Sequence, residues 1–260
     1  MLGTVIQAID RAARVLAALQ GSRHLGISEL GVILQLPPST VHGIVKSLQE
    51  HGLVVKEPHG QRYMLGPTLL QLSNVYLDTL DVRARAMRWT GDLSERTGLA
   101  VRLGVEFFDQ VIVIHHEPRP DGTRQMPETG LTIPAHASAL GKVLLAYRPA
   151  FLQSLLTKVP LRSLTGETLV EPELLEKALV DVVEKGYAVE DEEAVLGEAS
   201  VAVPVADRDG EAVAAIAVVL PASQQPLADS AMTLLREAAR NVSRELGSPT
   251  WPPVVATTDD

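Results

Sequence analysis

The chain has 260 residues, 46% of them hydrophobic and only 3% aromatic, and its 23 basic and 32 acidic residues give a net charge of −9. It contains no cysteine, which excludes disulfide and thiolate chemistry. It has no uncharged apolar run long enough to cross a bilayer and no signal-peptide pattern, so no membrane partner and a cytoplasmic location are expected.

The charge is unevenly distributed along the chain. Residues 1–66 carry six basic and four acidic residues, together with four of the seven histidines, whereas the remaining residues carry 17 basic and 28 acidic ones. A chain of this length is expected to form one large or two unequal domains. The sequence therefore predicts a small, mildly basic module joined to a larger acidic one.

The first module is expected to contain three helices. A first helix, ended by Gly21, would bury the apolar positions that recur at helical spacing: Val5, Ile9, Ala12, Leu16 and Leu19. Ser28 is a suitable N-cap for a second helix that would bury Leu30, Ile33 and Leu34. The two prolines that follow force a tight break, after which Ser39 would cap a third helix ending at Gly52.

Residues 53–65 hold two β-rich runs around Pro58-His59-Gly60, which indicates a hairpin. Three short helices followed by a hairpin predict a winged helix-turn-helix. The third helix has an outward face that is small, polar and nearly uncharged, with Gly43 in its middle. A glycine inside a helix costs about 1 kcal/mol of stability relative to alanine, so its presence needs a reason. Because glycine has no side chain, we interpret this face as one that a partner approaches closely.

Double-stranded DNA is the expected partner, because a face of this kind can enter the major groove while helix N-termini and basic side chains contact phosphates. The candidate contacts lie on the second and third helices and on the wing: Ser28, Pro38, Ser39, Thr40, His42, Gly43, Lys46, Ser47, Lys56 and Arg62. The alternative is a winged-helix protein–protein adaptor with a sensor domain. Salt-dependent binding to the upstream DNA would distinguish the two.

The second module is predicted to be α+β. After a helix over 66–80, which we expect to be a rigid linker, another helix spans 81–97 and is followed by strands at 99–108 and 110–117. Residues 118–136 are expected to form a loop, residues 137–147 and 172–186 helices, and residues 198–220 an antiparallel pair that turns at Asp209-Gly210. A final helix over 226–246 precedes a tail expected to be disordered. An antiparallel sheet flanked by helices is typical of a sensor domain.

No catalytic, metal or cofactor site is expected. The segment around Gly141 and Lys142 lacks the glycine and the hydroxyl residue of a phosphate-binding loop. His115 and His116 are adjacent on a strand, so their side chains point to opposite faces and are expected to be structural rather than metal ligands. The acidic run 190–193 is expected to be a solvated turn, and Ser200 lacks the context of a nucleophile.

Several motifs in order resemble the IclR family of bacterial transcription regulators: IDRAARVLAAL, STVHGIVKSLQEHGLV, RYMLGPTLLQL, PAHASALGKVLLAY, GYAVEDEEAVLGEASVAVPVADRDG and AAIAV. The resemblance implies a winged helix-turn-helix over 1–66, a linker helix over 67–80, a GAF-like effector-binding domain over 81–246 and a tail over 247–260. It also implies a homodimer or a dimer of dimers. Three segments are most similar to regulators of glycerol operons in actinomycetes, which implies a repressor of a catabolic operon that is relieved by glycerol or glycerol 3-phosphate.

The resemblance also implies positions for an effector pocket between the sheet and the PAHASALGK segment: Ala139, Leu140, Glu190, Ser200, Ala217 and Val219. Ala217 and Val219 stand where some members have serines, which removes two hydroxyls and disfavours a small carboxylate. Arg119, Arg124 and Lys142 are possible anion-binding groups, but we expect them to be surface charges. The leading hypothesis is a ligand-responsive, DNA-binding regulator.

Overall fold

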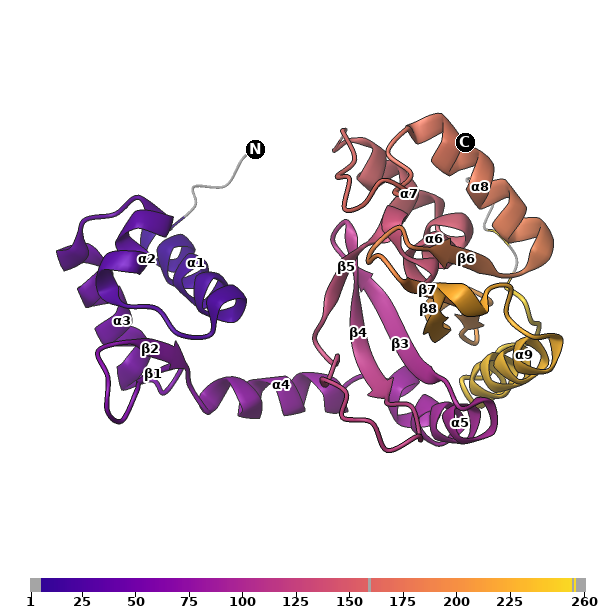
Figure 1. Ribbon diagram of the computed structural model, residues 1–260, viewed down its shortest axis with the longest axis horizontal. Helices are drawn as coiled ribbons and strands as arrows, with labels where there is room; N and C mark the ends of the chain where they lie inside the picture. Colours follow the sequence, from indigo (N-terminus) through magenta and orange to yellow (C-terminus); the bar gives the residue numbers. More distant parts are fainter. Residues whose placement is uncertain (1–5, 159, 254, 256–260) are drawn as a thin grey trace. The chain divides into compact units, whose positions relative to one another are not determined.

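The computed structural model describes residues 6–158, 160–253 and 255. The chain divides into two compact units, Met1–Thr79 and Leu80–Asp260. In the described residues no helix is both long and apolar enough to cross a membrane. Each unit has its own core, so each is described separately (Figure 1).

The first unit is a winged helix-turn-helix, as predicted. Its elements are α1 (Gln7–Ser22), α2 (Ile27–Leu34), α3 (Pro38–Glu50), β1 (Val54–Lys56), β2 (Tyr63–Leu65) and α4 (Thr68–Asp78). β1 and β2 pair antiparallel and form the wing. The main chains of Leu25 and Tyr63 form a further antiparallel bridge, which joins the segment before α2 to the wing.

The helix boundaries and part of the buried faces differ from the prediction. α1 continues through Gly21 to Ser22 and buries Val15 and Leu19, whereas Ile9 is 65% exposed. Gly26 is the N-cap of α2, which places Ser28 inside the first turn, and Ile33 is 50% exposed. Only a narrow strip of each of these helices packs against the core. Some of their apolar residues therefore remain exposed to solvent.

In α3, Pro37 is the N-cap and Pro38 the first helical residue, so Ser39 is not the cap. A proline suits this position because its missing N–H has no helical partner there. The helix ends at Glu50, and Gly52 follows with a φ of 66°. Val41, Val45 and Leu48 are buried as predicted. No residue of α4 is buried within the protomer.

The second unit is built on one six-stranded antiparallel sheet in the order β5-β4-β3-β8-β7-β6. The strands are β3 (Ala100–Phe107), β4 (Gln110–Glu117), β5 (Thr132–Pro134), β6 (Ala188–Asp191), β7 (Glu198–Ala206) and β8 (Ala212–Pro221). The helices α5 (Asp81–Thr97) and α9 (Asp229–Glu245) pack together on one face of this sheet.

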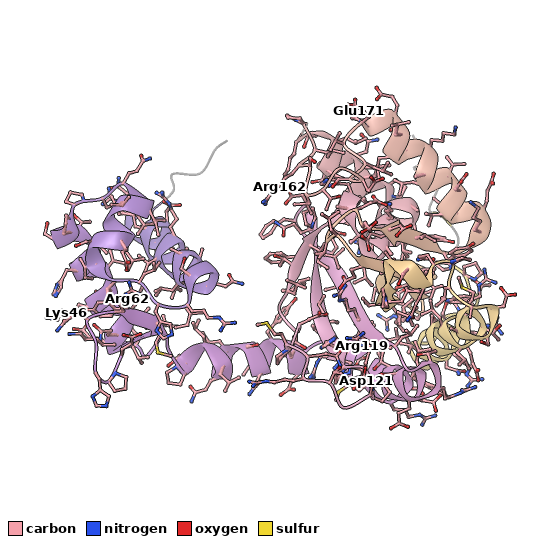
Figure 2. The ribbon with its side chains drawn as sticks, viewed as in Figure 1. Lys46, Arg62, Arg119, Asp121, Arg162 and Glu171 are labelled. Carbon is pink, nitrogen blue, oxygen red and sulfur yellow. The ribbon has the colours of Figure 1, made fainter. Side chains whose placement is uncertain are left out.

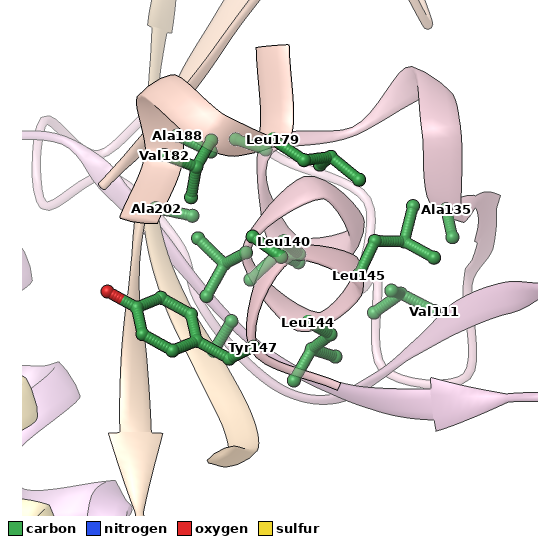
Figure 3. Close-up of a cluster of buried hydrophobic side chains, with 14 of the residues drawn as sticks. Val111, Ala135, Leu140, Leu144, Leu145, Tyr147, Leu179, Val182, Ala188 and Ala202 are labelled. Carbon is green, nitrogen blue, oxygen red and sulfur yellow. The ribbon is translucent and has the colours of Figure 1, made fainter. Parts of the chain in front are cut away.

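On the other face lies α6 (Ala139–Tyr147), a helix whose every residue is buried. It is surrounded by strand residues and by α8 (Pro172–Lys185), as the labelled Leu140, Val182 and Ala202 in Figure 3 illustrate. Gly141 allows the close approach of its first turn to the segment Ala135–Ala137, because a Cβ there would lie 2.2 Å from the Ala135 carbonyl oxygen. The predicted α+β class is therefore confirmed.

Several local predictions in the second unit were wrong. The expected loop 118–136 contains β5 and a 3₁₀ turn, and a further helix, α7 (Pro149–Leu156), follows α6. The acidic run 190–193 is not a solvated turn, since Glu190 and Glu193 are 2% and 8% exposed. In each case the local pattern is weak, and pairing with distant residues decides the structure.

The C-terminal segment also departs from the prediction of a disordered tail over 247–260. Trp251 donates its indole N–H to the carbonyl oxygen of Pro204 at 2.8 Å, and Arg240 lies over its ring. Pro253 is buried, and Val255 packs against the core around α6. The segment 248–253 is thus attached to the domain. Residues 254 and 256–260, which were part of the same prediction, lie outside the described residues.

Candidate nucleic-acid interface and ligand cavity

The outward face of α3 is solvent-exposed along its length. Pro38, Ser39, His42, Gly43, Lys46 and Ser47 are all exposed, and Thr40 is partly exposed. Among the described residues, a Cβ built on Gly43 would meet nothing within 4 Å, so packing within the first unit does not require glycine there. Within the described part of this unit the face is therefore available to a partner.

A groove of about 560 Å³ lies between the start of α2, α3 and the wing. Four of the predicted contact residues line it, and they come from three different elements: Ser28, His42, Lys56 and Arg62. The remaining six predicted residues continue along α3 beyond the groove. In Figure 2, Lys46 of α3 and Arg62 beside the wing are labelled on the same unit.

Within this groove the basic side chains are held by polar neighbours. Lys56 Nζ donates to Gln61 Oε1 at 2.6 Å, and Arg62 Nη2 donates to Glu29 Oε1 at 3.0 Å. Glu29 also lines the groove, and sequence reasoning did not single it out. An acidic residue in the first turn of a helix is common, because it stabilises the helix N-terminus. The sequence therefore did not indicate that Glu29 lies beside Arg62.

In the second unit, the implied effector positions gather on the sheet face that α6 covers. Glu190, Ser200 and Val219 lie side by side on β6, β7 and β8, since Glu190 pairs with Ser200 and Ser200 with Val219. Ala217 lies two pairs further along β8, on the same face of the sheet. Ala139 and Leu140 form the first turn of α6, where backbone N–H groups have no partner within the helix.

Glu190 is the centre of a buried hydrogen-bond network. Its Oε1 accepts from the backbone N–H groups of Glu193 (2.9 Å) and Ala194 (3.2 Å), and its Oε2 accepts from Ser200 Oγ at 2.9 Å. Burial raises the pKa of the Glu190 carboxyl, although these three hydrogen bonds oppose the rise. The buried carboxyl therefore holds the turn after β6 in place through these hydrogen bonds.

Lys142 was expected to be a surface charge, and this prediction was wrong. It is 4% exposed and forms an ion pair with the buried Glu193, and its Nζ also donates to the Val189 carbonyl oxygen at 3.3 Å. The ion pair between Lys142 and Glu193 thus connects α6 to the end of β6. Arg124, in contrast, is exposed, as expected.

A cavity of about 250 Å³ opens on the same sheet face, at the end where Val219 lies. Of the six implied positions, Val219 lines it, together with several polar side chains that the sequence did not indicate: Arg102, Gln125, Glu128 and Glu198. Arg119 also lines the cavity, with its Nε 3.9 Å from Asp121 (Figure 2). The volume is small compared with pockets for drug-sized ligands, typically about 300–1,000 Å³.

Arg102 organises this cavity. It is 6% exposed, its Nε and Nη2 donate to the Glu128 carboxylate at 2.6 and 3.0 Å, and its Nη1 donates to Glu198 Oε1 at 2.8 Å. Burial alone would lower the pKa of Arg102, but its hydrogen bonds with both carboxylates raise it, and the guanidinium stays charged. A charged residue within the apolar strand LAVRLGVEFF was the one signal that sequence reasoning could have used.

The histidines on β4 are engaged separately. His115 Nε2 lies 2.8 Å from Glu117 Oε1, whereas His116 Nε2 lies 3.5 Å from Glu128 Oε2. Burial lowers the pKa of His116 although Glu128 acts in the opposite direction. Across the described parts of the chain, no three His, Asp or Glu side chains come together as metal ligands.

Comparison with known proteins agrees with this architecture. Residues 8–58 match the family model of the IclR helix-turn-helix domain, and residues 74–244 match that of the bacterial transcriptional regulator IclR C-terminal domain. The chain is 41% identical to the glycerol operon regulatory protein of Streptomyces griseus, over 94% of this chain and 97% of that protein.

More distant relatives and solved structures are similar over comparable lengths. The transcriptional regulator XynR of Escherichia coli is 31% identical, over 94% of this chain and 99% of its own. The crystal structure of an IclR regulator from Alicyclobacillus acidocaldarius superposes with a TM-score of 0.78 at 27% identity, covering 93% of this chain and 99% of that one. These relatives are regulators of transcription rather than enzymes.

Proposed function

This chain belongs to the IclR family of bacterial transcriptional regulators, and from that premise we propose that it represses a catabolic operon and releases its operator when a small polar effector binds. It is a ligand-responsive, DNA-binding regulator and not an enzyme. The observation that carries the proposal is the groove between α3 and the wing, which gathers Ser28, His42, Lys56 and Arg62 on one surface.

Operator recognition follows from the geometry of the first unit. The exposed face of α3 enters the major groove, where His42, Lys46 and Ser47 contact base edges, while Gly43 allows the helix backbone to come close. Ser28, Ser39, Thr40 and the N-terminus of α3 with Pro38 contact phosphates. Lys56 and Arg62 contact the backbone or the minor groove beside the wing.

We propose that the protein acts as a homodimer or a dimer of dimers in the cytoplasm. Two apolar side chains one turn apart on α4 are exposed in the protomer, Leu72 by 57% and Val75 by 66%. Burying this face against a second copy would remove it from water at a gain of about 25 cal/mol per Å². Paired winged helices would then bind two half-sites of a palindromic operator.

For the effector we propose glycerol or glycerol 3-phosphate, bound on the α6 side of the sheet. The relative from Streptomyces griseus is named for a glycerol operon. In this chain the cavity at Val219 offers the polar partners that a polyol needs, through Arg102, Glu128 and Glu198, which compensates for the missing hydroxyls at Ala217 and Val219. Ser200 pairs with Val219 on the neighbouring strand, and we propose that the site extends from there toward Glu190, Ala139 and Leu140.

Two measurements test the proposal. Fluorescence anisotropy with DNA from upstream of its own gene should show tight, salt-dependent binding; binding that is absent or insensitive to sequence would favour a protein–protein adaptor. A thermal-shift series with glycerol, glycerol 3-phosphate and small organic acids should raise the unfolding midpoint only for the effector. The same compound should weaken operator binding, with a coupling of about 1–3 kcal/mol.

A further inference from the structure

Glu29 places a carboxylate in the groove that also contains His42, Lys56 and Arg62. The side chain is exposed, so packing in the core does not explain its position. DNA is a polyanion, and a negative charge on the surface that approaches it opposes binding to the phosphates. Glu29 also caps the start of α2, but a neutral glutamine could do so as well, so its negative charge calls for a role that offsets this cost.

The Glu29 carboxylate is held through both of its oxygens. Oε2 accepts from the backbone N–H of Gly26 at 2.7 Å, at the N-cap of α2. Oε1 accepts from Arg62 Nη2 at 3.0 Å. The main-chain bridge between Leu25 and Tyr63, with N···O distances of 2.8 and 3.1 Å, holds these two segments side by side. Glu29 thus fixes the direction of the Arg62 guanidinium from a rigid helix terminus.

The ion pair contributes little to folding. The side chains of Arg62 and Glu29 are 55% and 45% exposed, and pairs of this kind are weakened by solvent. Its main consequences are therefore the orientation of Arg62 and the charge of the groove. With Lys56 and Arg62 positive and Glu29 negative, the groove carries one net positive charge instead of two.

We propose that Glu29 is a specificity-determining residue of the DNA-binding surface, an inference that rests on the proposed function. Non-specific binding depends almost entirely on the neutralisation of phosphates by basic side chains. The negative charge of Glu29 therefore lowers the non-specific affinity by its whole electrostatic effect. Binding to the operator also includes base contacts, which depend on a fixed register of the groove and on the direction of Arg62. Glu29 therefore raises the ratio of operator affinity to non-specific affinity, through a repulsive element as well as an orienting one.

The test uses the full-length protein and the variant Glu29→Gln, whose amide oxygen can still accept from the Gly26 N–H. Binding is measured by anisotropy to a footprinted upstream duplex and to a scrambled duplex of the same length and composition, over a range of salt concentrations. The variant should bind the scrambled duplex at least about sixfold more tightly at low salt, with a salt slope steeper by about 0.9. The operator should gain less than twofold, so the affinity ratio should fall at least threefold.

Glu50→Gln is the matched control, because it removes the same charge from the exposed end of α3, outside the groove. It should change both affinities by the same factor. In an Arg62→Gln background, Glu29→Gln should alter the ratio less, since the residue it orients is absent. An equal effect in both backgrounds would overturn the orienting role.

The failures of the two proposals are distinguishable. If the wild-type protein shows no preference for the upstream duplex, the proposed function fails and this inference fails with it. If the wild-type protein prefers the upstream duplex but Glu29→Gln leaves the ratio unchanged, as Glu50→Gln does, only the role of Glu29 is overturned.

Discussion

Replacing Lys142 with methionine is expected to destabilise the second unit strongly, although lysine is the residue type least expected in a core. Lys142 and its partner Glu193 have side chains that are 4% and 10% exposed. Removing one member of a buried ion pair costs about 3–5 kcal/mol, because the other charge stays buried without compensation. Thr168 donates only to the backbone carbonyl of Glu193, so no other donor in this contact replaces the lysine.

This loss should be visible in the thermal midpoint of unfolding. A change of 1 kcal/mol shifts the midpoint by about 2–4 °C in a unit of 150–250 residues, which gives a decrease of about 6–20 °C for the variant. The only two tryptophans, Trp89 and Trp251, both lie in the second unit, so their fluorescence follows this unit selectively. Chemical denaturation followed at the same wavelength would provide the free energy of unfolding.

The double variant Lys142→Met with Glu193→Met decides whether the charge is responsible. Apolar replacement of a whole buried pair is often nearly neutral, so the double variant should regain at least about 2 kcal/mol over the single one. Lys185→Met is the matched control, since Lys185 pairs with Asp181 at 3.0 Å on the exposed side of α8 and should change the midpoint little. A double variant as unstable as the sum of the two single ones would refute the reasoning.

Four further outcomes are expected. Gly43→Ala should stabilise the first unit by up to about 1 kcal/mol in thermal unfolding and yet weaken operator binding in anisotropy, because its Cβ is tolerated by the protomer but occupies the DNA-facing side. Lys46→Ala should lower operator affinity and reduce the salt slope by about 0.9, with an unchanged unfolding midpoint. Because burial raises the pKa of Glu190, the stability that it contributes is present at low pH and is lost as the pH rises through the raised pKa, so Glu190→Gln should abolish this loss in midpoints measured across pH. Val75→Lys, on the exposed face of α4, should shift the sedimentation profile toward monomer.

Each of these expectations has a control variant or an outcome that would contradict it. Gly21→Ala, in α1 and equally unobstructed, should stabilise without affecting DNA binding; a similar loss of affinity would remove Gly43 from the interface. Equal affinity of Lys46→Ala and wild type would exclude a contact there. Glu184→Gln, on the exposed side of α8, should leave the pH profile unchanged, and a matching effect would place the titration elsewhere. Ser73→Lys adds the same charge on another side of α4 and should leave the oligomer intact; if both variants dissociated it, or neither did, the face at Val75 would not be a specific interface.

The sequence by itself determined the local elements of this protein and the character of its DNA-facing helix. Helical spacing around Val41, Val45 and Leu48, the paired prolines at the start of α3 and the turn after β1 are short-range features, and each has a direct physical effect on the backbone. The same is true of the polar outward face with Gly43. A periodic pattern shows which side of a helix is apolar, but it does not show how wide a strip the neighbours will cover, which is why Ile9 and Ile33 were wrongly placed in the core.

Only the tertiary structure decided which charged residues are buried and with whom they pair. Arg102 meets Glu198, 96 positions away, and Lys142 meets Glu193, 51 positions away, because the strand order β3-β8-β7-β6 and the packing of α6 bring them together. The sequence shows that Arg102 lies within an apolar strand, but for none of these residues does it show which partner the charge meets. Burial of a charge is stable only with its partner in place, and the partner is supplied by the fold, so the cavity at Val219 became visible only once the sheet was assembled.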